Sequence, residues 1–281
     1  MATIGETTVL ASGFDTLEGP AFDRYGNLFF VDWVRHSIMR RSSEGELREF
    51  YNTGGVPAGL AFHPDGSLWV ADEGDDIHGL LRITPDGSAS IIVNEYEGKP
   101  LNGANDLVFD RDGNVYFSDP WRTSAENPVG GFYRYTIDGE LQQLDSGMAF
   151  PNGVALTHDG QYIILAETYR NRLLRYRIDT DGTVGPREMW AETTLPSGPD
   201  GMAFASDGHL YVAHHGGGTV DIFAPDGSLT GTIAVPGKSV TNCAFGGPNR
   251  KTLVITECDT GSLYAIELDI PGQPLHDGFS R

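Results

Sequence analysis

Four side chains with oxygen donors recur at one position of a repeated segment. The segment is a short apolar stretch, a turn usually built on Asp-Gly and a second apolar stretch, and its six copies span residues 17–32, 57–72, 104–119, 151–167, 199–214 and 240–257. The second position of successive copies holds Glu18, Ala58, Asn105, Asn152, Asp200 and Thr241. Two carboxylates and two amide carbonyls, with no His or Cys, form a ligand set that suits a hard divalent cation.

The sequence therefore predicts a metal site in which Glu18, Asn105, Asn152 and Asp200 are the ligands. Ca²⁺ is the first candidate, and Zn²⁺, Mg²⁺ and Mn²⁺ are the alternatives. Any one of the four residues could instead serve only to form a hydrogen bond to a backbone group at the end of a buried strand. Four such residues at the same register favour a shared site.

The elements that must position these residues follow from the period of the repeat. The turn glycines Gly26, Gly66, Gly113, Gly160 and Gly208 are 40, 47, 47 and 48 residues apart, a period typical of propeller blades. The first strand of each blade lines the central channel, so equivalent positions form a ring around one axis. We predict an all-β six-bladed β-propeller with four antiparallel strands per blade. It is a single domain over residues 1–281, with residues 269–281 as a coil tail.

The ends of the chain indicate how the ring closes. The last copy supplies three strands, near residues 240–245, 252–256 and 263–268, and then the chain ends. Residues 7–11 read as a strand that has no partner of its own. We predict that this N-terminal strand completes the last blade and removes the open sheet edges.

A second ring of ionisable residues is expected at the mouth of the channel. Second strands return to the face where first strands begin, and they end at Asp32, Asp72, Asp119, Glu167, His214 and Glu257. The mouth should therefore be electronegative and rich in titratable groups. Asp32, Asp72 and Asp119 are expected to support turns or contacts between blades. The longer, polar segment 94–103 is expected to form a loop over the mouth.

The bulk composition excludes several classes of partner. A formal net charge of -20 argues against nucleic acids and anionic membranes, which would repel the chain. The N-terminal residues lack the basic and apolar regions of a signal peptide, and no stretch has membrane-spanning length, so a cytoplasmic protein is expected. Cys243 and Cys258 are too few for a disulfide framework and are expected to be reduced. We expect a monomer or a weak homo-oligomer.

Four motifs resemble one known family along nearly the whole chain. They are LEGPAFD from Leu17, LNGANDLVF from Leu101 with YFSDP from Tyr116, FPNGVAL from Phe150 and GPDGMAF from Gly198. In this order they resemble the regucalcin (senescence marker protein)/gluconolactonase family of six-bladed propeller lactonases. The resemblance implies a metal-dependent hydrolase of sugar lactones. It also implies that the metal is held by Glu18, Asn105, Asn152 and Asp200, with Asn105 as a substrate contact in some members.

The resemblance also suggests which residues contact the substrate. Many members place an Arg shortly before the Asn-Asp pair, whereas Lys99 stands in that neighbourhood here and lacks the bidentate fork of Arg. The substrate-binding residues expected from the resemblance and from the rim of the channel are Asn102, Asn105, Lys99, Trp121, Glu167 and His214.

The expected chemistry is hydrolysis of a cyclic ester. The cation would act as a Lewis acid on the lactone carbonyl, and Asp200, by analogy with the family, is the predicted catalytic base that accepts a proton from the attacking water. Activation of the water by the metal alone is the alternative. Two other functions stay open: a phosphotriesterase on the same calcium site, as in some similar propellers, and a non-catalytic propeller that binds calcium or a partner.

Overall fold

Hairpins with tight glycine turns build the sheets of the protein. The computed structural model describes residues 2–3, 5–194 and 196–276. The first hairpins of the second and third repeats turn at Gly66 and Gly113, whose φ angles of 87° and 89° lie in the left-handed region that favours glycine. The Asp65 carboxylate accepts a hydrogen bond from the Ser67 N–H at 2.8 Å and so fixes the turn. Each apolar run can therefore fold back antiparallel on the one before it.

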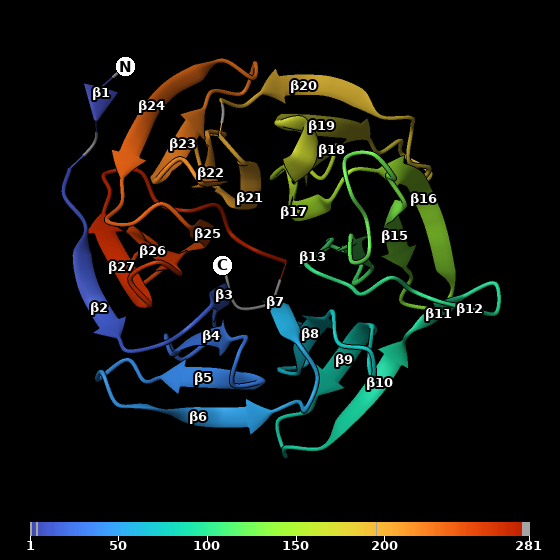
Figure 1. Cartoon of the computed structure of the whole chain (residues 1–281), viewed down its shortest axis with the longest axis horizontal. Coiled ribbons are helices and arrows are strands. Elements are labelled where there is room, and N and C mark those ends of the chain that lie inside the picture. Colours follow the sequence, from blue (N-terminus) through green and yellow to red (C-terminus); the bar gives the residue numbers. More distant parts are fainter. Residues whose placement is uncertain (1, 4, 195, 277–281) are drawn as a thin grey trace.

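Six blades of four antiparallel strands surround a central axis in the described part of the chain (Figure 1). The innermost strands are β3 (Leu17–Phe22), β7 (Pro57–Phe62), β13 (Leu107–Phe109), β17 (Pro151–Leu156), β21 (Gly198–Phe204) and β25 (Val240–Gly246). The second strands are β4 (Leu28–Asp32), β8 (Leu68–Asp72), β14 (Val115–Asp119), β18 (Tyr162–Glu167), β22 (Leu210–His215) and β26 (Thr252–Glu257). The third strands are β5 (Ser37–Arg41), β9 (Gly79–Ile83), β15 (Gly130–Tyr135), β19 (Arg172–Arg177), β23 (Thr219–Phe223) and β27 (Ser262–Glu267). The outer strands are β6 (Leu47–Asn52), β10 (Ala89–Val93), β16 (Leu141–Met148), β20 (Glu188–Glu192), β24 (Leu229–Ala234) and β2 (Thr8–Ser12). The predicted six-bladed propeller is confirmed.

The N-terminal strand closes the ring as predicted. Strand β2 pairs antiparallel with β27, so that Val9 lies opposite Tyr264 and Ser12 lies opposite Ser262. Blade six is thus built from both ends of the chain (Figure 1). The short strand β1 (Ala2–Thr3) pairs parallel with β24 and adds a fifth strand to the edge of blade five. This pairing covers the outer edge of β27, which would otherwise be left open.

The segment 94–103 does not form the predicted loop over the channel mouth, so that prediction is wrong. Its strands β11 (Glu95–Tyr96) and β12 (Lys99–Pro100) pair as a hairpin, which projects from the outer rim between blades two and three (Figure 1). Tyr96 packs edge-on against Tyr133 of β15, with ring centroids 5.5 Å apart. The aromatic contact with the outer half of blade three holds the hairpin away from the axis.

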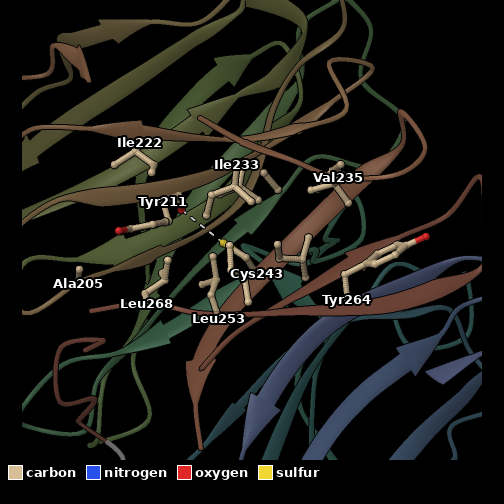
Figure 2. Packing of buried hydrophobic residues seen from close by; sticks show 14 residues of the cluster. Ala205, Tyr211, Ile222, Ile233, Val235, Cys243, Leu253, Tyr264 and Leu268 are labelled. Atoms are coloured by element: carbon tan, nitrogen blue, oxygen red, sulfur yellow. Dashed lines mark hydrogen bonds between the residues drawn. The ribbon is translucent and has the colours of Figure 1, made fainter. Parts of the chain in front are cut away.

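The hydrophobic core lies between neighbouring blades. The cluster between blades five and six includes Tyr211, Ile222, Cys243 and Leu253, all buried (Figure 2). The Cys243 thiol donates a hydrogen bond of 3.5 Å to the Tyr211 carbonyl, and burial raises the pKa of this thiol. Both cysteines are free, in agreement with the expectation from the sequence. Continuous packing from blade to blade makes the inner strands a rigid frame for the axis.

The segment after β27 packs across the end of the channel opposite the mouth. The Pro271 carbonyl accepts the Ser206 N–H after β21, and the Gly272 N–H donates to the Arg250 carbonyl after β25. The Gln273 side chain donates a hydrogen bond of 2.8 Å to the Leu156 carbonyl at the end of β17. Residues 269–276 form no helix or strand, in agreement with the predicted coil, and residues 277–281 lie outside the described residues. The helical content consists of one turn of 3₁₀ helix, η1 (Thr168–Arg170), within the described ranges. None of the described helical structure has the length and apolarity needed to cross a membrane.

Candidate active site

A β-bulge near the start of the innermost strands brings polar side chains to the axis. The pairing of β3 with β4 shifts register between Glu18 and Ala21, and equivalent shifts occur in blades two, four, five and six. A bulge re-aims side chains that strict alternation would send to opposite faces of the sheet. Consecutive residues of one blade, such as Thr241 and Asn242 of blade six, can therefore both take part in contacts around the axis.

Small residues at the third position of the repeat let neighbouring inner strands approach closely. A Cβ atom on Gly153 would collide with the Asp200 carbonyl oxygen and would lie 2.8 Å from the Gly201 Cα atom. A Cβ atom on Gly201 would in turn collide with the Asn242 side chain. Blades four and five therefore touch backbone to backbone at the level of the candidate ligands, and the backbone of blade five touches the Asn242 side chain of blade six.

We expect Gly153→Ala to lower both stability and calcium affinity. The added methyl group must push blade four away from blade five, which costs about 1–3 kcal/mol of unfolding free energy and separates Asn152 from Asp200. Urea denaturation and calcium-binding measurements would check both effects. Gly185→Ala is the matched control, because the nearest atom to a Cβ there would be 3.6 Å away. Equal stability and affinity in the two variants would contradict close contact at the axis.

The structure brings the four predicted ligands into one group. Asn105, Asn152 and Asp200 are buried, with between 4% and 9% of each residue exposed. Repulsion by Glu18 of blade one and by Asp106 of blade three contributes to the raised pKa of Asp200 in blade five. Side chains from alternate blades can repel one another in this way only where they converge at the axis.

The carboxyl groups at the axis lack cationic partners. Burial raises the pKa of Glu18 to about 7, of Asp106 to about 7 and of Glu73 to about 8, and it also raises the pKa of Asp200. None of the ion pairs formed among the described residues involves these four groups. Buried carboxylates normally pair with a cation, so the electrostatics of the site favour a positively charged ligand.

The donor set fits a hard cation that is held by both carboxylates and amides. Atom Oδ1 of Asp200 is buried and has no hydrogen-bond partner. Within the described ranges, no three His, Cys, Asp or Glu side chains lie close enough to hold a metal ion by themselves. A cation near Glu18 and Asp200 would therefore need the amide oxygens of Asn152 and Asn105, and oxygen-only coordination of this kind suits Ca²⁺.

Hydrogen bonds between blades fix the orientation of the polar side chains. Asn152 Nδ2 lies 3.3 Å from the Thr168 hydroxyl, which donates to the Pro199 carbonyl of blade five at 2.7 Å. Asn242 Nδ2 donates to Glu18 Oε2 at 3.2 Å and thereby joins blade six to blade one. The Asn242 oxygen accepts the Cys243 N–H at 2.8 Å, so Asn242 orients Glu18. In contrast, the contact of the Asn152 nitrogen with Thr168 leaves the Asn152 oxygen for a cation.

Three of these groups were not identified as site residues from the sequence. Asn242 occupies the third position of the last repeat, Thr168 begins η1 and Glu73 follows the last residue of β8. Blade two has the apolar Ala58 at the ring position, and Glu73 is the acid nearest in sequence to the end of its second strand. The missing ring residue in blade two was the signal that could have directed attention to Glu73. The carboxylate of Asp106, the residue after Asn105, accepts the Val154 N–H at 3.1 Å and links blade three to blade four.

The predicted mouth is at the correct end of the channel, and one rim residue lies beside the site. Pro57 pairs with Asp72 and Pro151 pairs with Glu167, so second strands end where first strands begin. Trp121 packs edge-on against Trp33, with ring centroids 6.1 Å apart. The two indoles form an aromatic wall from blades one and three.

The other predicted substrate contacts are not brought to the axis group. Lys99 is exposed on the outer hairpin β11–β12, and the Asn102 amide donates to Asp119 Oδ2 at 3.1 Å and to the Val129 carbonyl at 3.2 Å. Glu167 accepts the Ala149 N–H at 2.8 Å and pairs with Arg172 at 2.5 Å. The ring nitrogens of His214 contact Asp221 at 3.0 Å and the Pro196 carbonyl at 3.2 Å. These contacts occupy the polar atoms of Asn102, Glu167 and His214 with protein partners.

A wide channel continues below the acidic group. Its cavity of about 1030 Å³ reaches from Asp106 and Asn242 to Gln273 in the C-terminal segment. The residues at the fifth position of the six repeats line it, and all of them have short side chains: Ala21, Ala61, Val108, Ala155, Ala203 and Ala244. Short side chains at this position leave the axis below the acidic group unfilled.

The protein is thus a six-bladed propeller whose axis is lined by oxygen donors and carries acidic side chains without ion-pair partners among the described residues. The model of the SMP-30/Gluconolactonase/LRE-like region matches residues 17–259, and the chain belongs to this family. It is 30% identical to the diisopropyl-fluorophosphatase of Loligo vulgaris, over 89% of this chain and 88% of that protein. It is also 30% identical to the gluconolactonase of Zymomonas mobilis, over 88% of this chain and 78% of that protein. The solved structure of a gluconolactonase from Xanthomonas campestris is 26% identical and superposes with a TM-score of 0.82, over 95% of this chain and 89% of that one.

Proposed function

We propose that the protein is a metal-dependent hydrolase that opens a sugar lactone. The observation that carries the proposal is the convergence of Glu18, Asn152 and Asp200 at the axis, where one oxygen of Asp200 is buried without a partner. Membership of a family that includes lactonases and a gluconolactonase supports hydrolysis of a cyclic ester. Calcium is the cation that we propose, because all the candidate donors are oxygens.

In this proposal the side chains at the axis bind the cation and the substrate. Glu18, Asn152 and Asp200 would hold the cation, and Asn105 would supply a fourth oxygen to the cation or to the substrate. The bound cation would polarise the lactone carbonyl and stabilise the negative charge that develops on its oxygen.

The proton transfers are assigned to Asp200. Its carboxylate accepts a proton from the attacking water while the water oxygen bonds to the carbonyl carbon. The ring C–O bond then breaks, and the proton passes to the departing alkoxide oxygen to give a hydroxy acid. The indoles of Trp33 and Trp121 would pack against the substrate ring beside the reacting bond, since aromatic faces bind the apolar faces of sugars.

Hydrolysis of a phosphorus ester is the second candidate function. The chain is 30% identical to diisopropyl-fluorophosphatase over 89% of its length. Its identity to gluconolactonase is also 30%. The same oxygen donors could bind a cation that polarises either a carbonyl or a phosphoryl group. The choice between the two therefore depends on the substrate that fits beside the indoles.

The experiment that tests the proposal is a substrate screen with controlled metal content. Purified protein is analysed for bound metals, treated with a chelator and assayed on a panel of aldonolactones and on a phosphotriester, with Ca²⁺, Mg²⁺, Mn²⁺ or Zn²⁺ added back. We expect lactone hydrolysis to fall at least about 100-fold after metal removal and to return with calcium. Hydrolysis that survives metal removal would contradict the metal dependence. Preferred hydrolysis of the phosphotriester would favour the second candidate, and calcium binding without turnover would indicate a non-catalytic propeller.

A further inference from the structure

Glu73 brings a buried carboxyl group to the blade that lacks a polar residue in the ring. Blade two has Ala58 at the ring position, and Glu73 directly follows Asp72 at the end of β8. Only 4% of Glu73 is exposed. Its N–H donates to the Val56 carbonyl at 2.8 Å, which ties its backbone to the residue that precedes β7. The carboxyl group is therefore anchored at the level where β7 begins.

The Glu73 carboxyl group contacts the neighbouring blades on both sides. Asn105 Nδ2 of blade three donates to Glu73 Oε1 at 2.8 Å. The Trp33 side chain of blade one hydrogen-bonds to the same carboxyl group and opposes the effect of burial on its pKa. A Cβ atom on Gly103 would lie 2.8 Å from both the Glu73 carbonyl oxygen and Trp121 Cβ, so the segment that leads to Asn105 packs directly against Glu73.

These contacts determine which end of the Asn105 amide remains for the site. An asparagine side chain has one donor end and one acceptor end. Atom Nδ2 is directed at Glu73, so Oδ1 is directed away from it. The Asn105 backbone cannot turn to compensate, because its N–H donates to the Ser118 carbonyl at 3.0 Å and its carbonyl accepts the Gly59 N–H at 2.6 Å.

We propose that Glu73 is a positioning residue that makes Asn105 an oxygen donor at the axis. By holding the amide nitrogen, it presents Oδ1 of Asn105 to the cation or to a substrate bound to the cation. The inference rests on the proposed function for the identity of that ligand. It assigns to blade two a part in the site that the residue at the ring position, Ala58, cannot play.

The test compares substitutions that keep or remove the acceptor. Glu73→Gln retains an amide oxygen that can accept from Asn105 Nδ2, whereas Glu73→Ala and Glu73→Met remove it. Asp76→Asn is the control, because Asp76 is an exposed acid in the same loop. Isothermal titration of the metal-free variants with calcium chloride gives the affinity, and lactone kinetics give kcat and KM separately.

We expect calcium affinity or kcat/KM to fall about 10–100-fold in Glu73→Ala and Glu73→Met, as when a group that orients a ligand is removed. Glu73→Gln should stay within about threefold of the wild type, and Asp76→Asn should be unchanged. A change confined to KM would place Asn105 on the substrate, and a change in calcium affinity would place it on the cation. Wild-type affinity and kinetics in both Glu73→Ala and Glu73→Met would overturn the proposal.

A second readout separates this inference from the proposed function. The Asn105 side-chain amide protons can be followed by NMR in ¹⁵N-labelled protein and assigned with an Asn105→Asp variant. We expect slow exchange of these protons with solvent in the wild type and in Glu73→Gln, and fast exchange in Glu73→Ala. If the wild type hydrolyses no lactone but shows this pattern, the proposed function fails and the positioning role stands. Equally fast exchange in the wild type and Glu73→Ala would overturn the positioning role.

Discussion

Asp200→Asn is expected to reduce lactone hydrolysis about 1000-fold while the propeller stays folded. The substitution replaces the proposed proton acceptor with a neutral amide of the same shape, and loss of a general base typically costs 10²–10⁴-fold. It also removes one of the two carboxylates that would hold the cation. The measurement is kcat at saturating calcium and substrate, together with a thermal unfolding curve of each protein.

The folded state should tolerate this substitution because the Asp200 carboxylate forms no ion pair with a described residue. Its Oδ1 is buried without a partner, and Glu18 and Asp106 both repel its charge. Removing a buried, repelled charge costs little and can stabilise the protein without metal. Asp226→Asn, at an exposed turn on the outside of blade five, is the control and should keep full activity. An Asp200→Asn enzyme with wild-type kcat would exclude Asp200 from proton transfer.

The fold could be predicted because its two main signals are local in sequence and repeat six times. Asp-Gly turns between apolar runs define each hairpin, and the period places the hairpins in a ring. The position of segment 94–103 could not be predicted in the same way. Its length and polarity indicate a loop, but the contact of Tyr96 with Tyr133 that directs it outward joins residues of different elements. No periodic pattern encodes such a contact.

The site was predictable to the extent that it follows the symmetry of the propeller. Glu18, Asn105, Asn152 and Asp200 share one register, so a ring argument finds them. Glu73 reaches the same axis from the end of a second strand, and a register argument cannot find it. Asn242 stands one residue later than the ring position and becomes available through the bulge in β25.

For the rim residues, the repeat predicts the position along the channel but not the partners of the side chains. Glu167 ends β18 and His214 is the last but one residue of β22, so both lie at the mouth, but their polar atoms are used by Arg172 and Asp221 within their own blades. Position in a repeat predicts where a residue lies along the channel. Whether its side chain is free for a ligand depends on partners that the repeat does not specify.

Raising the pH should destabilise the metal-free protein, and calcium should reverse the effect. The folded-state pKa of Glu18 is about 7 and that of Glu73 about 8, compared with an ordinary value of 4.5. The folded state therefore binds protons more tightly than the unfolded state. Its extra stability is complete below about pH 4.5 and is lost as the pH rises through about 7 to 8. A shift the size of that of Glu18 corresponds to roughly 3 kcal/mol.

The measurement is urea unfolding in a chelator at about pH 5 and about pH 8.5, followed by the same experiment in calcium. We expect the unfolding free energy of the metal-free protein to fall by several kcal/mol between the two pH values, and calcium to restore most of it at the higher pH. Surface repulsion from the net charge of -20 acts in the same direction but is screened by salt, so added sodium chloride serves as a control for it. Glu18→Gln should flatten the pH dependence because it removes one of the titrating groups. A metal-free protein that is equally stable at both pH values would mean that the axial carboxyl groups are solvated or paired, and the electrostatic argument for a cation at the axis would then fail.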